Sequence, residues 1–298
     1  MKKSLGRLSV RLYQNPQFRE LMFTARMFKR DNAAIVCLGI LGFLYFLAVF
    51  GPWVAPHDPY EIKPGNILEA PSSKFLFGTD SLGRDLLSRL IYGARLSMFF
   101  GVIVVSCNAL IGLPFGAVSG YMGGRADDIM MRIGEILTSF PGLALVLILT
   151  WLFGRGFTAA IIAMSIGGWF FPARLIRSVV LLEKEKDYVK AAKVLGKSGF
   201  SVLFREILPN AIHPLICQST INIGYSIISF AGLSFIGVGT QPPEPDWGSM
   251  IALGRDHLMT EPWVAITPGI FIILATLSFT VVGDTLRDAL DPRLRRQI

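Results

Sequence analysis

Residues 33–54 read AAIVCLGILGFLYFLAVFGPWV and contain no charged side chain. A helix needs about 20 predominantly apolar residues to cross a bilayer, and this run is long enough. The apolar region of a signal peptide is shorter, about 7–15 residues, and Pro52 and Pro56 do not suit a cleavage site that requires small residues. We therefore predict a retained transmembrane helix at 33–54, preceded by a cytoplasmic leader at 1–32.

The composition of the whole chain agrees with a membrane protein. Of its 298 residues 52% are hydrophobic and only 17% are charged, whereas an average soluble domain has about 25% charged residues. The high apolar fraction excludes a disordered chain, and three cysteines are too few for a disulfide scaffold. The net charge of +8 is explained by basic cytoplasmic loops and requires no nucleic-acid partner.

Five further apolar segments of similar length follow the first. They are Ser97–Val118, Met130–Phe153, Thr158–Val180, Pro214–Ile236 and Trp263–Val282. The sequence thus predicts an all-α multi-pass membrane protein with six transmembrane helices. Its parts are the first helix, an outer loop at 55–96, a five-helix core at 97–283 and a tail at 284–298. The core contains an inner loop at 181–213 and an outer loop at 237–262.

The distribution of Lys and Arg sets the expected orientation. With both ends inside, the inner segments carry 22 of these residues and the outer segments carry 7. Cytoplasmic loops of membrane proteins are enriched in Lys and Arg, so both termini are expected in the cytoplasm.

The inner loop 181–213 has a regular apolar pattern. Tyr188, Ala191, Ala192 and Leu195 recur at helical spacing and define one face. Gly196 is suited to the left-handed conformation that ends a helix, and a second helix is expected at 200–208, where Pro209 would stop it. A helix–Gly–helix hairpin with a small apolar tip could insert into a groove on another protein. The alternative is an amphipathic connector that only joins two spans.

The fifth predicted span carries a polar stripe. The stripe consists of Gln218, Asn222, Tyr225, Ser229 and Gly232, which point in about one direction at helical periodicity. Polar groups inside a membrane usually face a bundle interior or an aqueous path. The stripe is therefore a candidate lining of a translocation path, and hydrogen bonding between helices is the alternative.

The inner loop resembles the "EAA" loop of ABC importer permeases. That pattern is Glu-Ala-Ala, three residues, Gly, and a Leu-Pro pair about nine residues later. Here Ala191-Ala192, Gly196 and Leu208-Pro209 match it, while Lys190 replaces the usual Glu. Segments at 29–32, 77–89, 120–127, 234–248 and 284–292 extend the likeness over about residues 25–293. Together they resemble the C-type permease subunit of dipeptide, oligopeptide and nickel importers.

The resemblance implies a type I importer fold in a bacterial inner membrane. It also implies contact with lipid, a second (B-type) permease, two cytoplasmic ATPases and an external binding protein. ATP and Mg²⁺ would bind only to the ATPases, so this chain would be no enzyme and would hold no cofactor. The coupling contact with the ATPase would involve Tyr188, Ala191, Ala192, Leu195, Gly196 and Pro209.

Other residues have weaker expected roles. Asp80, Arg84, Asp85 and Trp247 are candidates to face the binding protein, although the first three are equally suited to ion pairs that order the outer loop. His57, His213 and His257 lack the spacing of metal ligands.

The expected cargo is a peptide, with nickel or glutathione as alternatives. A membrane-embedded enzyme would need a nucleophile–base pair or a metal motif within the spans, and none is visible. An ion-driven carrier or channel would usually carry intramembrane acids, and the span centres contain none.

Overall fold

The computed structural model describes residue 24 and residues 26–290, which form helices and loops with one isolated bridge between Thr79 and Asp85. The main helices are α3 (Asn32–Val54), α4 (Leu86–Met122), α5 (Gly124–Thr138), α6 (Gly142–Phe153), α7 (Phe157–Gly168), α8 (Phe170–Lys184), α9 (Asp187–Val194), α10 (Gly199–Val202), α11 (Leu208–Phe235), α12 (Trp247–Gly254) and α13 (Trp263–Leu290). The prediction of an all-α membrane protein is confirmed.

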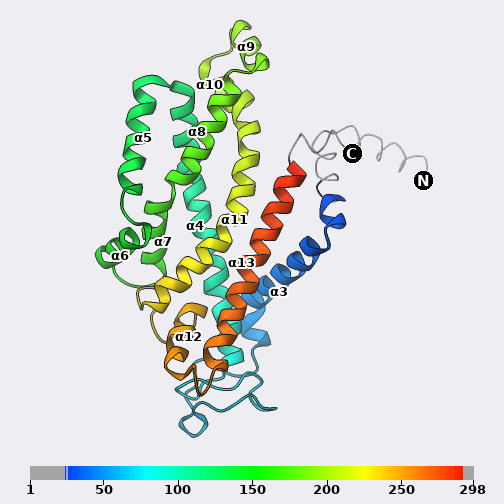
Figure 1. Ribbon diagram of the computed structural model, residues 1–298, viewed down its shortest axis with the longest axis vertical. Helices are drawn as coiled ribbons and strands as arrows, with labels where there is room; N and C mark the ends of the chain where they lie inside the picture. Colours follow the sequence, from blue (N-terminus) through cyan, green and yellow to red (C-terminus); the bar gives the residue numbers. More distant parts are fainter. Residues whose placement is uncertain (1–23, 25, 291–298) are drawn as a thin grey trace, which may run out of the picture.

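The long helices α4, α8 and α11 run through the middle of the molecule (Figure 1). Helices α3 and α13 cover one side of them and α5–α7 the other, while α9 and α10 lie at the end opposite α12. The start of α3 is joined to the end of α13, because the Thr285 hydroxyl donates to Asp31 Oδ2 at 3.0 Å. Asp31 also caps α3 by accepting from the backbone N–H of Ala33 at 2.9 Å.

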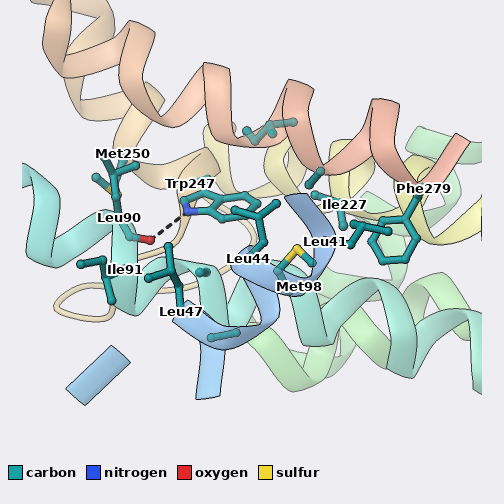
Figure 2. Close-up of a cluster of buried hydrophobic side chains, with 14 of the residues drawn as sticks. Leu41, Leu44, Leu47, Leu90, Ile91, Met98, Ile227, Trp247, Met250 and Phe279 are labelled. Carbon is teal, nitrogen blue, oxygen red and sulfur yellow. Dashed lines mark hydrogen bonds between the residues drawn. The ribbon is translucent and has the colours of Figure 1, made fainter. Parts of the chain in front are cut away.

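The main hydrophobic core lies where α3, α4, α12 and α13 meet around Trp247 (Figure 2). The Trp247 side chain is fully buried, and its Nε1–H donates to the Leu90 carbonyl at 3.1 Å. Leu44, Met98 and Phe279 fill the space along the same cluster. A buried Trp contributes a large apolar area but needs a partner for its N–H, and Leu90 provides that partner.

Helices α4 and α8 approach each other closely through glycines. A Cβ atom added at Gly116 would lie only 2.1 Å from the Ala173 carbonyl oxygen, and Gly112 and Gly120, one turn away on either side, are similarly crowded by α8. Small residues four apart allow membrane helices to pack backbone against backbone. This contact fixes α8, and with it the start of the loop that follows.

Four helices are long and apolar enough to cross a membrane, namely α3, α4, the continuous pair α7–α8, and α13. The pair α5–α6 would be a fifth span, bent by 84°. The polar residues of α11 lower its mean hydropathy, so this helix of 28 residues is not in that set. The predicted total of six spans and the cytoplasmic placement of both ends remain predictions.

Several predicted helix boundaries are wrong, whereas the boundaries of the loops and the tail relative to the membrane remain predictions. Helix α4 begins at Leu86, so residues 86–96, predicted as part of the outer loop, are helical; Asp85 caps this helix by accepting from Ser88 N–H at 2.9 Å. Helix α13 continues to Leu290, into the predicted tail at 284–298. The outer loop 237–262 contains α12. The remainder of the leader and of the tail, 1–23, 25 and 291–298, lies outside the described residues.

The prediction that Pro209 stops a second short helix is also wrong. Helix α10 continues through a π-helical turn, Leu203–Ile207, directly into α11. Pro209 lies directly after this π-helical turn, in the first turn of α11. The inner loop therefore connects to α11 without a break.

Candidate coupling loop and translocation path

Gly196 makes the turn between α9 and α10. Its φ is +76°, the left-handed region, and a Cβ there would meet no atom within 4 Å. The predicted helix–Gly–helix turn is therefore present, and the requirement for glycine is a backbone requirement rather than a lack of space.

The four residues predicted to form one docking face of α9 do not share one environment. Ala192 is only 5% exposed and packs with Val189 into a cluster formed by α4, α8 and α11. Ala191 is exposed, and Leu195 is 79% exposed at the end of the helix. The expectation of a common outward face is corrected, because Ala192 packs into the protein's own hydrophobic core while Leu195 remains exposed.

The exposed apolar side chains gather at the tip of the loop. We call Val194, Leu195 and Phe200 the docking tip; all three are more than two-thirds exposed. Phe200 also stacks on Phe204, with ring centroids 4.3 Å apart. Apolar side chains exposed together are a common feature of protein interaction sites.

The Tyr188 side chain is 38% exposed, but its hydroxyl makes two hydrogen bonds to neighbouring helices. Its hydroxyl donates to Glu183 Oε2 at 2.5 Å and accepts from Asn210 Nδ2 at 3.2 Å, which joins α9 to α8 and α11. Burial, together with the hydrogen bond to Glu183, raises the pKa of Tyr188 to about 12. A phenol that remains protonated at neutral pH can keep donating this bond, so Tyr188 stabilises the base of the loop.

Tyr121, at the end of α4, contacts both short helices of the loop. The ammonium groups of Lys184 and Lys193 lie 5.7 and 5.8 Å from its ring centroid, and Lys184 donates to its carbonyl at 2.8 Å. The backbone of Gly199 packs beside its hydroxyl, where an added Cβ would be 3.2 Å away. The loop is therefore seated on the end of α4.

The polar stripe of α11 lines a cavity of about 200 Å³ between α4, α7, α8 and α11. Gln218, Asn222, Tyr225 and Ser229 contribute to this polar cavity, whereas Gly232 does not. Gln218 Nε2 donates to Asn222 Oδ1 at 3.2 Å, and Tyr225 is 62% exposed. The arrangement places amide and hydroxyl groups around an open space, as a translocation path requires, and the role of the stripe itself remains a prediction.

Sequence patterns did not identify Asn108 of α4 or Gly168 of α7, which line the same cavity. Asn108 Oδ1 is buried and, among the described residues, has no hydrogen-bond partner. A Cβ at Gly168 would lie 2.4 Å from Asn108 Nδ2, so this glycine makes room for the amide. An Asn within an apolar run was the available signal, but nothing local linked it to α11.

The outer residues Asp80, Arg84 and Asp85 are buried. Asp80 Oδ2 pairs with Arg84 Nε at 2.7 Å and with Arg89 Nε at 3.5 Å. Arg89 in turn donates to the carbonyl of Pro59 at 2.9 Å. Of the two roles expected for these charges, the geometry is that of ion pairs ordering the loop, and the expectation that they face a binding protein is corrected.

Trp247 does not face outward either, because it is the centre of the main core. The preceding residue, Asp246, caps α12 by accepting from the backbone N–H groups of Gly248 and Ser249 at 2.9 and 3.1 Å. Burial raises the pKa of the Asp246 carboxyl. Within residues 26–290, no group of three His, Cys, Asp or Glu side chains is arranged to hold a metal ion.

The helical bundle, its partly open cavity and the loop at one end are consistent with a membrane transport protein, and the comparisons specify its class. Residues 112–296 match the family described as "Binding-protein-dependent transport system inner membrane component", and the chain belongs to this family of ABC importer permeases. Residues 23–71 match "N-terminal TM domain of oligopeptide transport permease C". The chain is thus a multi-pass inner-membrane protein.

Curated relatives extend over almost the whole chain. The di/tripeptide transport system permease protein DppC of Pseudomonas aeruginosa (strain UCBPP-PA14) is 39% identical over 90% of each chain. The dipeptide transport system permease protein DppC of Bacillus subtilis (strain 168) is 40% identical over 91% of this chain and 85% of that protein. The glutathione transport system permease protein GsiD of Escherichia coli O6:K15:H31 (strain 536 / UPEC) is 38% identical over 91% and 89%.

Solved structures share the fold at lower identity. The MetNI methionine ABC transporter in an inward-facing conformation matches with a TM-score of 0.58 and 19% identity, over 68% of this chain and 97% of that chain. An amino acid ABC transporter with histidines matches with a TM-score of 0.53 and 20% identity, over 70% and 94%. The predicted type I importer permease fold is therefore confirmed.

Proposed function

We propose that this chain is the C-type permease subunit of an ATP-driven peptide importer. The observation that carries the proposal is the 39–40% identity to two di- or tripeptide permeases over at least 85% of both chains. The chain would pair with a B-type permease, receive its cargo from an external binding protein, and dock two ATPases that hold ATP and Mg²⁺.

The connections of the inner loop support an ATP-driven mechanism. The docking tip is exposed and is available to an ATPase subunit, while Tyr188 and Val189 attach the loop to α8 and α11. Because the loop continues into α11 without a break, a displacement of the tip would be transmitted to the helix that carries the polar stripe. Closure of the ATPases would in this way change the shape of the polar cavity.

The lining of the polar cavity favours a peptide over nickel. Its polar side chains are amides and hydroxyls, which both donate and accept hydrogen bonds and so suit a peptide main chain. Nickel prefers imidazole or other nitrogen and oxygen ligands in a defined geometry, and the described lining contains no His, Cys or carboxylate. Glutathione is the second candidate cargo, because a glutathione permease is similarly related.

Reconstitution of the purified complex in proteoliposomes tests the proposal. We expect ATP-dependent accumulation of a labelled dipeptide or tripeptide when the binding protein is present, and none with an ATPase-inactive partner. Preferential uptake of glutathione or Ni²⁺ would reassign the cargo. Cargo flux down a gradient without ATP would instead identify a channel and contradict the importer assignment.

A further inference from the structure

A second cavity, of about 390 Å³, adjoins the polar cavity. The two cavities share Met164, Gly168 and Ser229 in their linings. The second one lies where the bent pair α5–α6 faces α7 and the outer half of α11. Phe140, from the short segment between α5 and α6, forms part of its wall.

The side chains that line the second cavity differ from those that line the first. Its wall is built mainly from Leu137, Phe140, Leu143, Leu145, Val146 and Leu233, with glycines and the hydroxyls of Thr138 and Ser229. We call it the apolar cavity. A cavity of about 150 Å³ is already large enough for a benzene molecule, so the apolar cavity has room for an aromatic or branched side chain.

We propose that the apolar cavity is a side-chain subsite for the cargo, next to a main-chain subsite in the polar cavity. This inference rests on the proposed function as a peptide importer. Amide groups of Asn108, Gln218 and Asn222 lie in the polar cavity and can exchange hydrogen bonds with a peptide backbone. The shared residues then mark the point at which an apolar side chain leaves the backbone and enters the apolar cavity.

The position of Gly167 offers a direct way to fill the apolar cavity. It lines the cavity, and a Cβ there would meet only Leu145 Cδ2, at the ordinary contact distance of 3.6 Å. Gly167→Leu would therefore project its extra atoms into the open space. Gly269→Leu is a matched control, because Gly269 lies in a membrane-spanning helix, lines neither cavity and has nothing within 4 Å of an added Cβ.

The experiment compares ATP-dependent uptake of Phe-Ala and Ala-Ala by the complete reconstituted complex. Apolar pockets discriminate between side chains by about 10- to 200-fold. We expect Gly167→Leu to lower the Phe-Ala to Ala-Ala ratio at least tenfold, whereas Gly269→Leu keeps the wild-type ratio. A ratio unchanged in Gly167→Leu, with both peptides transported, would overturn the subsite.

A second variant tests the chemistry without filling the space. Leu143→Gln keeps a similar length but places an amide in the wall, and we expect it to lower the same ratio. If the Gly167→Leu complex does not assemble, an unchanged Phe-Ala to Ala-Ala ratio in Leu143→Gln would overturn the subsite. If the wild-type complex accumulates neither peptide with ATP, the proposed function itself fails, an outcome distinct from an unchanged ratio.

Discussion

Asp127 of α5 and Arg177 of α8 form a bidentate ion pair, with Nε donating to Oδ1 and Nη2 donating to Oδ2, each at 2.6 Å. The Ser119 hydroxyl of α4 also donates to Asp127. This carboxylate is buried and is the point at which α4, α5 and α8 are joined. No sequence pattern indicated that these three side chains would meet.

Removal of Arg177 should destabilise the protein. A hydrogen bond to a charged group contributes about 1.5–3 kcal/mol, and Arg177→Ala would leave the Asp127 carboxylate buried without its cation. We expect a lower thermal midpoint in detergent. Arg177→Lys should recover only part of the loss, because a single ammonium cannot reproduce both parallel bonds.

The matched control is the double variant Asp127→Asn with Arg177→Leu, which removes both charges. It should be more stable than Arg177→Ala alone, since no unpaired charge remains buried. Equal midpoints for Arg177→Ala and the wild type would contradict a structural role for this pair.

Gly196 should be replaceable by Asn but not by Val. The left-handed conformation costs most L-residues roughly 1–2 kcal/mol, whereas Asn adopts it more readily. Because no other part of the chain lies near an added Cβ, the cost arises from the local backbone conformation alone. We expect Gly196→Val to reduce peptide uptake per ATP hydrolysed and Gly196→Asn to retain most of it. Near-normal uptake by Gly196→Val would show that residue 196 is only a flexible linker and would contradict this prediction.

Leu195 and Val189 should respond differently to the same change. Leu195 is 79% exposed and Val189 is fully buried. Leu195→Asp should alter the free energy of unfolding by no more than about 0.5 kcal/mol while weakening co-purification of the ATPases. Val189→Asp buries a charge and should cost about 2 kcal/mol or more. Retention of the ATPases by Leu195→Asp would remove the docking tip from the interface.

Asp246 should make the stability of the outer end depend on pH. Its pKa is raised above the ordinary 3.8 by burial, so its stabilising contribution is present below that value and is lost as pH rises through the folded pKa. Asp246→Asn keeps an oxygen that can cap α12 without the charge. The difference in thermal midpoint between this variant and the wild type should therefore grow in favour of Asn from pH 4 upward.

The control for Asp246 is the loss of the cap itself. Asp246→Ala removes the acceptor for the Gly248 and Ser249 N–H groups and should cost about 0.5–2 kcal/mol at any pH. A wild-type midpoint that changes with pH in parallel with Asp246→Asn would show that another group titrates.

Sequence patterns predicted those elements that depend on neighbouring residues in the chain. The span at 33–54 matches α3 within one residue, because an uninterrupted apolar run and its Asp31 cap define it. The start of α4 was missed because Arg89 and Arg95 interrupt the apolar pattern, although Asp85 before an apolar pair is a cap signal. Helical periodicity likewise gathered the polar stripe on one face, and four of its five residues line the polar cavity.

Tertiary contacts decided the features that the sequence did not predict. Asp80 and Arg84 satisfy each other inside the outer loop, so charge alone gave no sign that they are buried. Ala192 and Leu195 have the spacing of a single face, yet only Ala192 reaches the core cluster. Asn108 joins α11 at the cavity from a helix more than a hundred residues earlier, a separation that periodicity does not bridge.

The length of α4 has a mechanical consequence. At 1.5 Å per residue its 37 residues span about 55 Å, well beyond the roughly 30 Å of a hydrocarbon core. One end is held by the buried charges of the outer loop, and the other contacts the inner loop through Tyr121. Movement at one end can therefore pass to the other without an intervening loop, and Pro114, which lacks a backbone N–H, is the position within α4 at which the helix can bend.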